Sequence, residues 1–465
     1  MKTFFRLIED VNLMRMVVGI CIVVDGYPII FFFRETLKLA PGSTVFTALI
    51  LAGGLVLMVP FTALRRLYRP NMTMFWLGMG FIALSIFYMF FYNGHAASFD
   101  DYGRDLLYYV YILLFLFLLI NIPNDVIRVF VPVVVLFTLV SNLGLIYSLI
   151  TNPTWSVGQR ATITFASDNT DDGSGNPHVF ARNAFMGLVA CVIWLVRTQT
   201  GTFFRLVCFF AGIINVAVLI LTQVRSAILA LLIVVVLFCY YNVRPAQIRS
   251  AVRGLFKPVP VLIILIGTIS VYYFFQRYYD IYSTLYGYAL GFAERNLENV
   301  YALLGFKVAG ANYRAVLDDS VANRTLSAAF FLNALAFETD MLILGYGYKY
   351  TYLDVPILEA ATSMGILGFY LFGAINAMSL YYSLRAMRRN PTSLNAFLGY
   401  FYIYIFVTVC TGGRPYDTSF WYPLSLMIRF MGIDHLFPDY LKNNPAAVIS
   451  PVSSPRLVAS APQLT

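Results

Sequence analysis

Arg225 is the residue of this sequence best placed to bind a phosphate group. It lies in the stretch TQVRSA (222–227), at the start of a long apolar segment. A guanidinium grips such an anion well, because its planar fork of N–H donors matches two phosphate oxygens at once. The alternative is an ordinary interfacial arginine. The favourable insertion free energy of the apolar residues that follow outweighs the roughly 2.5–3.5 kcal/mol that one charged side chain costs within a span.

Tyrosines gather in and beside the segment 277–356, and Tyr346 and Tyr348 among them are candidate substrate contacts. Aromatic faces stack on sugars, and they also anchor helices at a membrane interface. The cluster therefore fits either a glycan groove or interfacial anchoring. Its members are Tyr278, Tyr279, Tyr282, Tyr286, Tyr288, Tyr346, Tyr348, Tyr350 and Tyr352.

Two more ionisable residues attract attention. Asp25 lies inside the first apolar segment, where an ionisable side chain is a functional candidate or a partner for backbone groups freed by Pro28. Arg414 lies with Asp417 in a short polar loop, either as a turn with an ion pair or as the rim of an acceptor site. The acidic stretch 168–175 resembles a calcium loop only in part, so we expect no metal and no cofactor.

Composition indicates that most of the surface faces lipid. The chain has 465 residues, of which 60% are hydrophobic and 12% charged, and its mean hydropathy is +0.74. Soluble domains carry about 45–50% apolar and about 25% charged residues. Apolar blocks recur at lengths of roughly 18–22 residues, enough to cross a bilayer as helices. We therefore predict an all-α polytopic membrane protein of about 12 transmembrane helices.

The predicted spans divide the chain around one long polar segment. Residues 1–276 hold nine helices and an outer loop at 151–182, residues 277–356 form a large helical outer loop, and residues 357–432 hold three more helices. Residues 433–465 are expected to form a cytoplasmic tail, disordered because its composition buries no core. The spans are predicted near 14–33, 43–62, 72–92, 106–122, 129–150, 183–200, 204–222, 226–243, 258–276, 357–378, 391–411 and 418–432.

Basic residues indicate the orientation. They concentrate in alternate short loops, such as 243–257 and 385–391, which the positive-inside rule assigns to the cytoplasm. Both termini should then be cytoplasmic and the segment 277–356 should lie outside. The net charge of +9 follows from this asymmetry, so the lipid bilayer is an expected partner and nucleic acid is not.

Four motifs, in the right order, resemble the O-antigen polymerase and O-antigen ligase superfamily of membrane glycosyltransferases. NPHVFA (176–181) is similar to that family's N-P-N-x-x-A, and TQVRSA (222–227) to its T-x-S-R-G/S-A. The stretch from Arg324 to Gly347 resembles R…P-L-x-G-x-G, and the stretch 354–368 resembles H-N-x-x-L-E…G-I-L-G. The likeness covers roughly residues 155–378.

The resemblance implies a GT-C-like enzyme at the periplasmic face of the bacterial inner membrane. Its substrate would be a saccharide on polyprenyl (undecaprenyl) diphosphate, which leaves as a glycosidic bond forms. This chemistry needs cations around the phosphates and a base for the acceptor hydroxyl. Arg225 and Arg324 match the family's arginines and are the expected diphosphate ligands. Arg314 and Arg277 are further candidates, each also compatible with a solvated loop charge.

The ligases of this family have a histidine where this chain has Asp354. An aspartate also accepts a hydroxyl proton, so Asp354 is the candidate base. Alternatively, Asp354 orients a sugar hydroxyl or caps a turn. Glu338 and Glu359 are the competing carboxylates.

Because the histidine is missing, we expect a polymerase that joins lipid-linked repeat units of a surface polysaccharide such as the O-antigen of lipopolysaccharide. One alternative is a ligase that moves the glycan to another acceptor. Another is a polysaccharide transporter or flippase, although the two halves of the chain share no hydropathy repeat. A chain-length regulator protein is a candidate partner.

Overall fold

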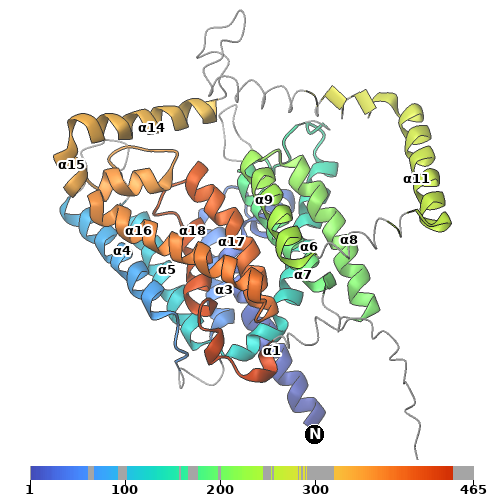
Figure 1. Ribbon diagram of the computed structural model, residues 1–465, viewed down its shortest axis with the longest axis horizontal. Helices are drawn as coiled ribbons and strands as arrows, with labels where there is room; N and C mark the ends of the chain where they lie inside the picture. Colours follow the sequence, from blue (N-terminus) through green and yellow to red (C-terminus); the bar gives the residue numbers. More distant parts are fainter. Residues whose placement is uncertain are drawn as a thin grey trace, which may run out of the picture.

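The computed structural model is built from helices packed into one bundle (Figure 1). No β-strand occurs in the described part of the chain. The structure describes residues 2–60, 67–92, 102–156, 159–165, 176–196, 201–243, 253, 256–280, 282–283, 286–287, 290 and 319–442.

The helices follow the apolar blocks of the sequence. In chain order they are α1 (Lys2–Asp25), α2 (Tyr27–Phe31), the π-helix Phe32–Thr36, α3 (Thr44–Met58), α4 (Met72–Phe91), α5 (Tyr102–Asn121), α6 (Ile127–Thr151), α7 (Pro177–Val196), α8 (Thr202–Leu221), α9 (Arg225–Asn242), α11 (Pro258–Arg277), α14 (Asp319–Phe337), α15 (Thr339–Leu344), α16 (Pro356–Arg389), α17 (Ser393–Thr411) and α18 (Thr418–Phe430).

Among the described residues, seven helices are long and apolar enough to cross a membrane, or eight if the bent segment at the N-terminus is one span. The seven are α4, α6, α7, α8, α9, α16 and α17. The prediction of a polytopic all-α membrane protein is thus confirmed at this level. In the other predicted spans, α3 and α5 form shorter apolar helices and α18 has 13 residues. The predicted ninth span forms α11, which stands to one side of the bundle in Figure 1.

Helix α17 forms the centre of the bundle. Almost all of its residues are buried, and it contacts α6, α7, α9, α16 and α18. Its C-terminal end opens into the loop 412–417, which leads directly into α18. A helix enclosed by five others holds its ends in place, so this loop has a rigid support.

The first predicted span is broken. Residues Glu9–Asp25 and Tyr27–Thr36 form two helical parts bent by 81° at Gly26. Pro28 stands at the start of the second part, where proline is tolerated because the amide there needs no partner within the helix. The bend leaves Asp25 at the end of α1, fully buried.

Helix α16 is also broken, at Met364 and Gly365, where Gly365 has φ +63°. The break frees two carbonyl groups, and the loop Gly345–Gly347 supplies their partners. The backbone N–H of Tyr346 donates to Thr362 O (2.7 Å) and that of Gly347 donates to Ser363 O (3.0 Å). The first part of α16, residues 356–363, is therefore fixed against this loop.

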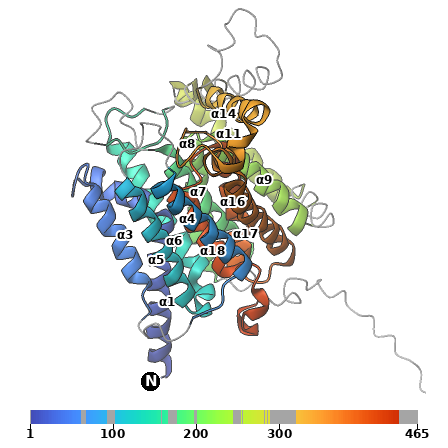
Figure 2. The ribbon, with the colours of Figure 1, turned by 90° about the vertical axis from the view of Figure 1, so that its left-hand side faces the viewer.

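Helices α14 and α15 lie across the end of the bundle opposite the N-terminus in both views (Figures 1 and 2). Apolar residues at helical spacing predict helices at 282–306 and 325–337 within the segment 277–356, and the second is confirmed as part of α14. The companion prediction, Tyr282–Phe306, falls mostly outside the described residues. At the other end of the chain, residues 433–442 form two 3₁₀ turns with Leu441 buried, because Ile433, Phe437 and Leu441 are spaced to face the bundle. Residues 433–442, the described part of the segment predicted as a disordered tail, are therefore folded against the bundle.

Candidate functional site

An open cavity of about 470 Å³ lies where α7, α9 and α18 begin and α17 ends. Residues from segments far apart in the sequence meet in its wall, and most of them are polar. The polar lining residues are Asn176, His178, Arg182, Ser226, Tyr352, Asp354, Tyr404, Thr408, Thr411, Arg414, Asp417 and Ser419.

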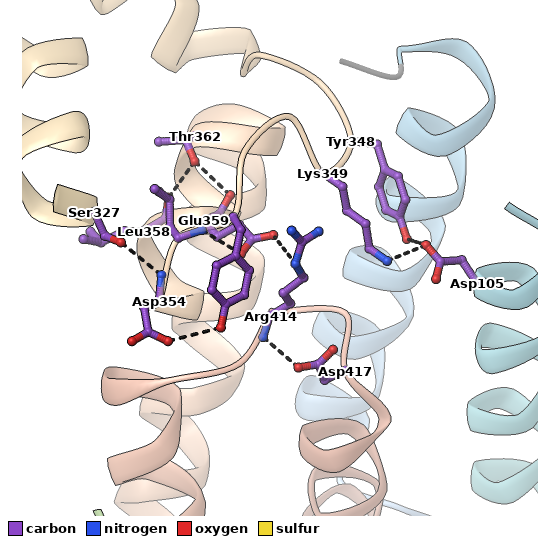
Figure 3. Close-up of polar contacts among 12 residues, drawn as sticks. Asp105, Ser327, Tyr348, Lys349, Asp354, Leu358, Glu359, Thr362, Arg414 and Asp417 are labelled. Atoms are coloured by element: carbon purple, nitrogen blue, oxygen red, sulfur yellow. Dashed lines mark hydrogen bonds and ion pairs between the residues drawn. The ribbon is translucent and has the colours of Figure 1, made fainter. Parts of the chain in front are cut away.

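Asp354 is the only one of the three candidate carboxylates that lines this cavity. Its backbone N–H donates to Ser327 Oγ (3.0 Å), which ties it to α14, and its Oδ1 accepts from the hydroxyl of Tyr352 at 3.1 Å (Figure 3). Burial and the Asp354 carboxylate raise the pKa of Tyr352 to about 12. Tyr352 therefore stays protonated and donates its hydrogen bond to the Asp354 carboxylate.

Arg414 lies beside Asp354 and is held from two sides (Figure 3). Its Nε lies 3.7 Å from Oε1 of the fully buried Glu359, and its Cζ lies 4.9 Å from the centroid of the Tyr352 ring. Glu359 Oε2 accepts from the backbone N–H of Leu353 (3.3 Å). A chain of contacts thus runs from Glu359 through Arg414 and Tyr352 to Asp354, and it fixes the cation next to the candidate base.

The loop 412–417 is a tight turn that places Arg414 in the cavity. The backbone N–H of Arg414 donates to Asp417 Oδ2 (2.7 Å), and the N–H of Asp417 donates to Arg414 O (3.0 Å). Burial raises the pKa of the Asp417 carboxyl, and the hydrogen bond from Arg414 opposes that change. The turn expected from the sequence is present, and Arg414 also borders the cavity. Its ionic partner is Glu359.

The loop between α15 and α16 is anchored to α5 on the far side of the site. Lys349 Nζ lies 2.6 Å from Asp105 Oδ2, which also accepts from the hydroxyl of Tyr348 (2.9 Å) (Figure 3). The hydroxyl of Tyr109 lies 3.0 Å from that of Tyr348. Burial lowers the pKa of Lys349, and Asp105 opposes this. The paired charges hold the loop that carries Asp354.

The candidate tyrosines therefore have structural contacts. Tyr348 is buried in the network with Asp105, and the hydroxyl of Tyr346 donates to Glu338 Oε2 at 2.5 Å. Neither Tyr346, Tyr348 nor Glu338 lines the cavity.

The predicted arginines lie in different places. Arg225 is half-buried as the first residue of α9, next to Ser226 in the cavity wall. Arg277 is exposed at the end of α11. Arg324 belongs to α14, but its side chain is outside the described part, and Arg314 lies wholly outside the described residues.

The outer loop predicted at 151–182 would include the cavity residue Arg182, and that boundary is wrong. Helix α7 begins at Pro177, so Arg182 lies inside the helix, with its Nε 2.8 Å from Asp25 Oδ1. The signal was present: Asn176 and Pro177 are typical of a helix start, and the Asn176 side chain accepts from the N–H of His178 (2.9 Å).

The site combines two carboxylates, two buried or half-buried guanidinium groups and several hydroxyl groups around an open space. Such a set suits proton removal from a hydroxyl group together with binding of an anion. In comparisons with known proteins, no family model matches the chain and no curated protein matches it either.

Proposed function

We propose that this protein polymerises oligosaccharide repeat units carried on polyprenyl diphosphate, building a bacterial surface polysaccharide such as an O-antigen. The observation that carries the proposal is that Asp354, Arg414 and Ser226, the neighbour of Arg225, border one cavity. A base and anion-binding groups around one open space are what transfer from a diphosphate to a hydroxyl requires.

In the proposed reaction, the anomeric carbon of the growing chain loses its bond to the diphosphate oxygen and gains a bond to an acceptor hydroxyl. Asp354 takes the hydroxyl proton, and the diphosphate leaves with the bonding electron pair. Arg225 and Arg324 are the proposed diphosphate ligands from the motifs, and Arg414 contacts the reacting sugars. Asp354 is suited to its role because Tyr352 and Ser327 fix both its carboxylate and its backbone.

The proposed setting is the bacterial inner membrane, with 12 spans, both termini in the cytoplasm and the reaction at the periplasmic face. Helices α14 and α15 would then cover the periplasmic end, as expected for part of a large outer loop. What supports this arrangement is the position of these helices opposite the N-terminus (Figure 2). Seven or eight of the proposed spans are candidate membrane helices among the described residues.

The direct test gives the purified protein an undecaprenyl-diphosphate-linked oligosaccharide, in detergent and without any ion gradient. We expect longer lipid-linked glycans, and we expect Arg225→Ala and Arg225→Lys to make few of them, since lysine lacks the bidentate fork. Transport of the glycan with no lengthening would identify a flippase instead.

Polymerase and ligase are distinguished in a deletion strain. Surface glycans of single repeat units would support polymerisation, whereas long chains left on the lipid carrier would indicate a ligase.

A further inference from the structure

Arg182 is the buried cation of the cavity, and three contacts fix it. Its side chain is 7% exposed and borders the open space. Its Nε donates to Asp25 Oδ1 (2.8 Å), Nη2 donates to Val24 O (3.0 Å) and Nη1 donates to Ser419 O (3.4 Å). The guanidinium is therefore held between α1, α7 and the start of α18, in one orientation.

These contacts leave donors for a ligand. A guanidinium carries five N–H donors, and the three contacts engage Nε and one N–H of each terminal nitrogen. One N–H on Nη1 and one on Nη2 have no hydrogen-bond partner among the described residues. Two such donors on neighbouring nitrogens form the fork that binds a phosphate bidentately.

The surroundings of Arg182 also favour an anion. Asn176, which precedes α7, lines the same cavity, as do His178 and Val179 from the first turn of α7 and Ser226 from the first turn of α9. The N-terminal ends of helices carry a partial positive charge and unpaired N–H groups. Arg182 and two helix starts thus form one wall of the cavity, which we name the α7–α9 wall.

Stability does not account for a charged pair at this place. Replacing a buried ion pair by apolar side chains of similar size is often neutral or stabilising, although removing one partner alone is costly. An apolar pair would join α1 to α7 equally well. What an apolar pair would lack is the fork of donors facing the cavity.

We propose that Arg182, held in place by Asp25, binds the diphosphate group of the lipid-linked substrate at the α7–α9 wall. The inference rests on the proposed function and adds to it a diphosphate-binding residue that lies outside the family motifs. Asp354 and Arg414, which line the same cavity, then bind the acceptor sugar.

The test uses the full-length protein in lipid nanodiscs and inorganic pyrophosphate as the probe, with calorimetry as the readout. We expect the wild type to bind pyrophosphate. The double variant Asp25→Leu/Arg182→Met should remain folded, with its thermal unfolding midpoint preserved, and bind about 10- to 100-fold more weakly, the loss expected for hydrogen bonds to a charged group. Arg182→Lys keeps the charge but loses the fork, so its affinity should fall between the two.

A matched control removes another buried ion pair. Arg34 and Glu35 lie 2.6 Å apart, with side chains 9% and 3% exposed, and neither lines the cavity. The double variant Arg34→Met/Glu35→Leu should therefore bind pyrophosphate like the wild type.

Equal binding by wild type and Asp25→Leu/Arg182→Met would overturn the inference. So would a wild type that binds glucuronate and not pyrophosphate, since the wall would then recognise an acidic sugar. In either case the proposed function survives if the wild type still lengthens lipid-linked glycans. If it neither binds pyrophosphate nor lengthens glycans, both proposals fail.

Discussion

The three candidate carboxylates differ in what surrounds them, and that difference predicts their roles. Asp354 borders the cavity and accepts from Tyr352. Glu338 accepts from Tyr346 outside the cavity wall, and Glu359 is buried behind Arg414. A base has to reach the proton that it removes. Only Asp354 has that access without a rearrangement of the protein.

We therefore predict that Asp354→Asn lowers the rate of glycan lengthening by about 10²–10⁴-fold, the usual contribution of a general base. The amide keeps the size of the side chain and accepts the bond from Tyr352, so the protein should remain folded. Rates are measured with purified protein at matched concentration. Asp354→His should retain some turnover, because an imidazole serves as a base near neutral pH.

The control is Glu338→Gln, which keeps an oxygen that accepts the bond from Tyr346 and should change the rate far less. Normal-length polymer from Asp354→Asn would mean that the base lies elsewhere, and Glu359 would be the next residue to substitute.

At this scale, sequence reasoning found part of the site. Motif spacing identified Asp354, and loop polarity identified Arg414; both line the cavity. Arg182 was missed because the predicted span began one residue after it. Its partner, Asp25, is 157 positions away in the chain, and no local pattern joins the two. The buried charge of Asp25 was the available clue, since such a group needs a partner.

The break in α16 is the element on which the site depends. Gly365 has φ +63°, and a Cβ there would lie 2.2 Å from Ile343 O. Gly365→Ala should destabilise the protein by at least about 1–2 kcal/mol, because an L-residue is disfavoured at that φ and the Ile343 carbonyl group has to move. Glycan lengthening should fall as well, because the first part of α16 carries Glu359, the partner of Arg414. Thermal unfolding in detergent measures the first effect.

Gly373 provides the control on the same helix. It is helical, and a Cβ there meets nothing within 4 Å. Gly373→Ala should leave activity unchanged and be neutral or stabilising by about 0.5–1 kcal/mol, since alanine is the better helix former. Equal unfolding midpoints for the two variants would contradict the role assigned to the break.

The elements themselves were largely predictable, and the breaks within them were not. Long apolar runs indicate helices, and Gly345-Tyr346-Gly347 indicates a turn. The span predicted at 357–378 is instead one broken helix, Pro356–Arg389. Its break depends on the carbonyl groups of 362 and 363, which accept hydrogen bonds from a loop 16 residues upstream, a tertiary contact that hydropathy does not encode.

For the whole molecule, hydropathy predicts the class of protein, because surface in contact with lipid has to be apolar along its whole length. Orientation is a separate property that follows from charge. Helix α16 bears on both hydropathy and charge. The part after its break, 366–389, ends in Arg388 and Arg389. At 1.5 Å per residue that part is about 36 Å long, more than the roughly 30 Å of hydrocarbon in a bilayer.

If this part of α16 crosses the bilayer, α15 and the end of α16 lie on opposite sides. The positive-inside rule assigns Arg388 to the cytoplasm and Asp340, exposed in α15, to the outside. In a background with the exposed Cys239 and Cys410 replaced by serine, an impermeant maleimide applied to cells or spheroplasts should label Asp340→Cys. Arg388→Cys should react only after permeabilisation. Labelling of both positions in intact cells would show that α16 does not cross the bilayer. Labelling of Arg388→Cys alone would show the opposite orientation, with the cavity on the cytoplasmic side. That result would contradict a polymerase that acts at the periplasmic face.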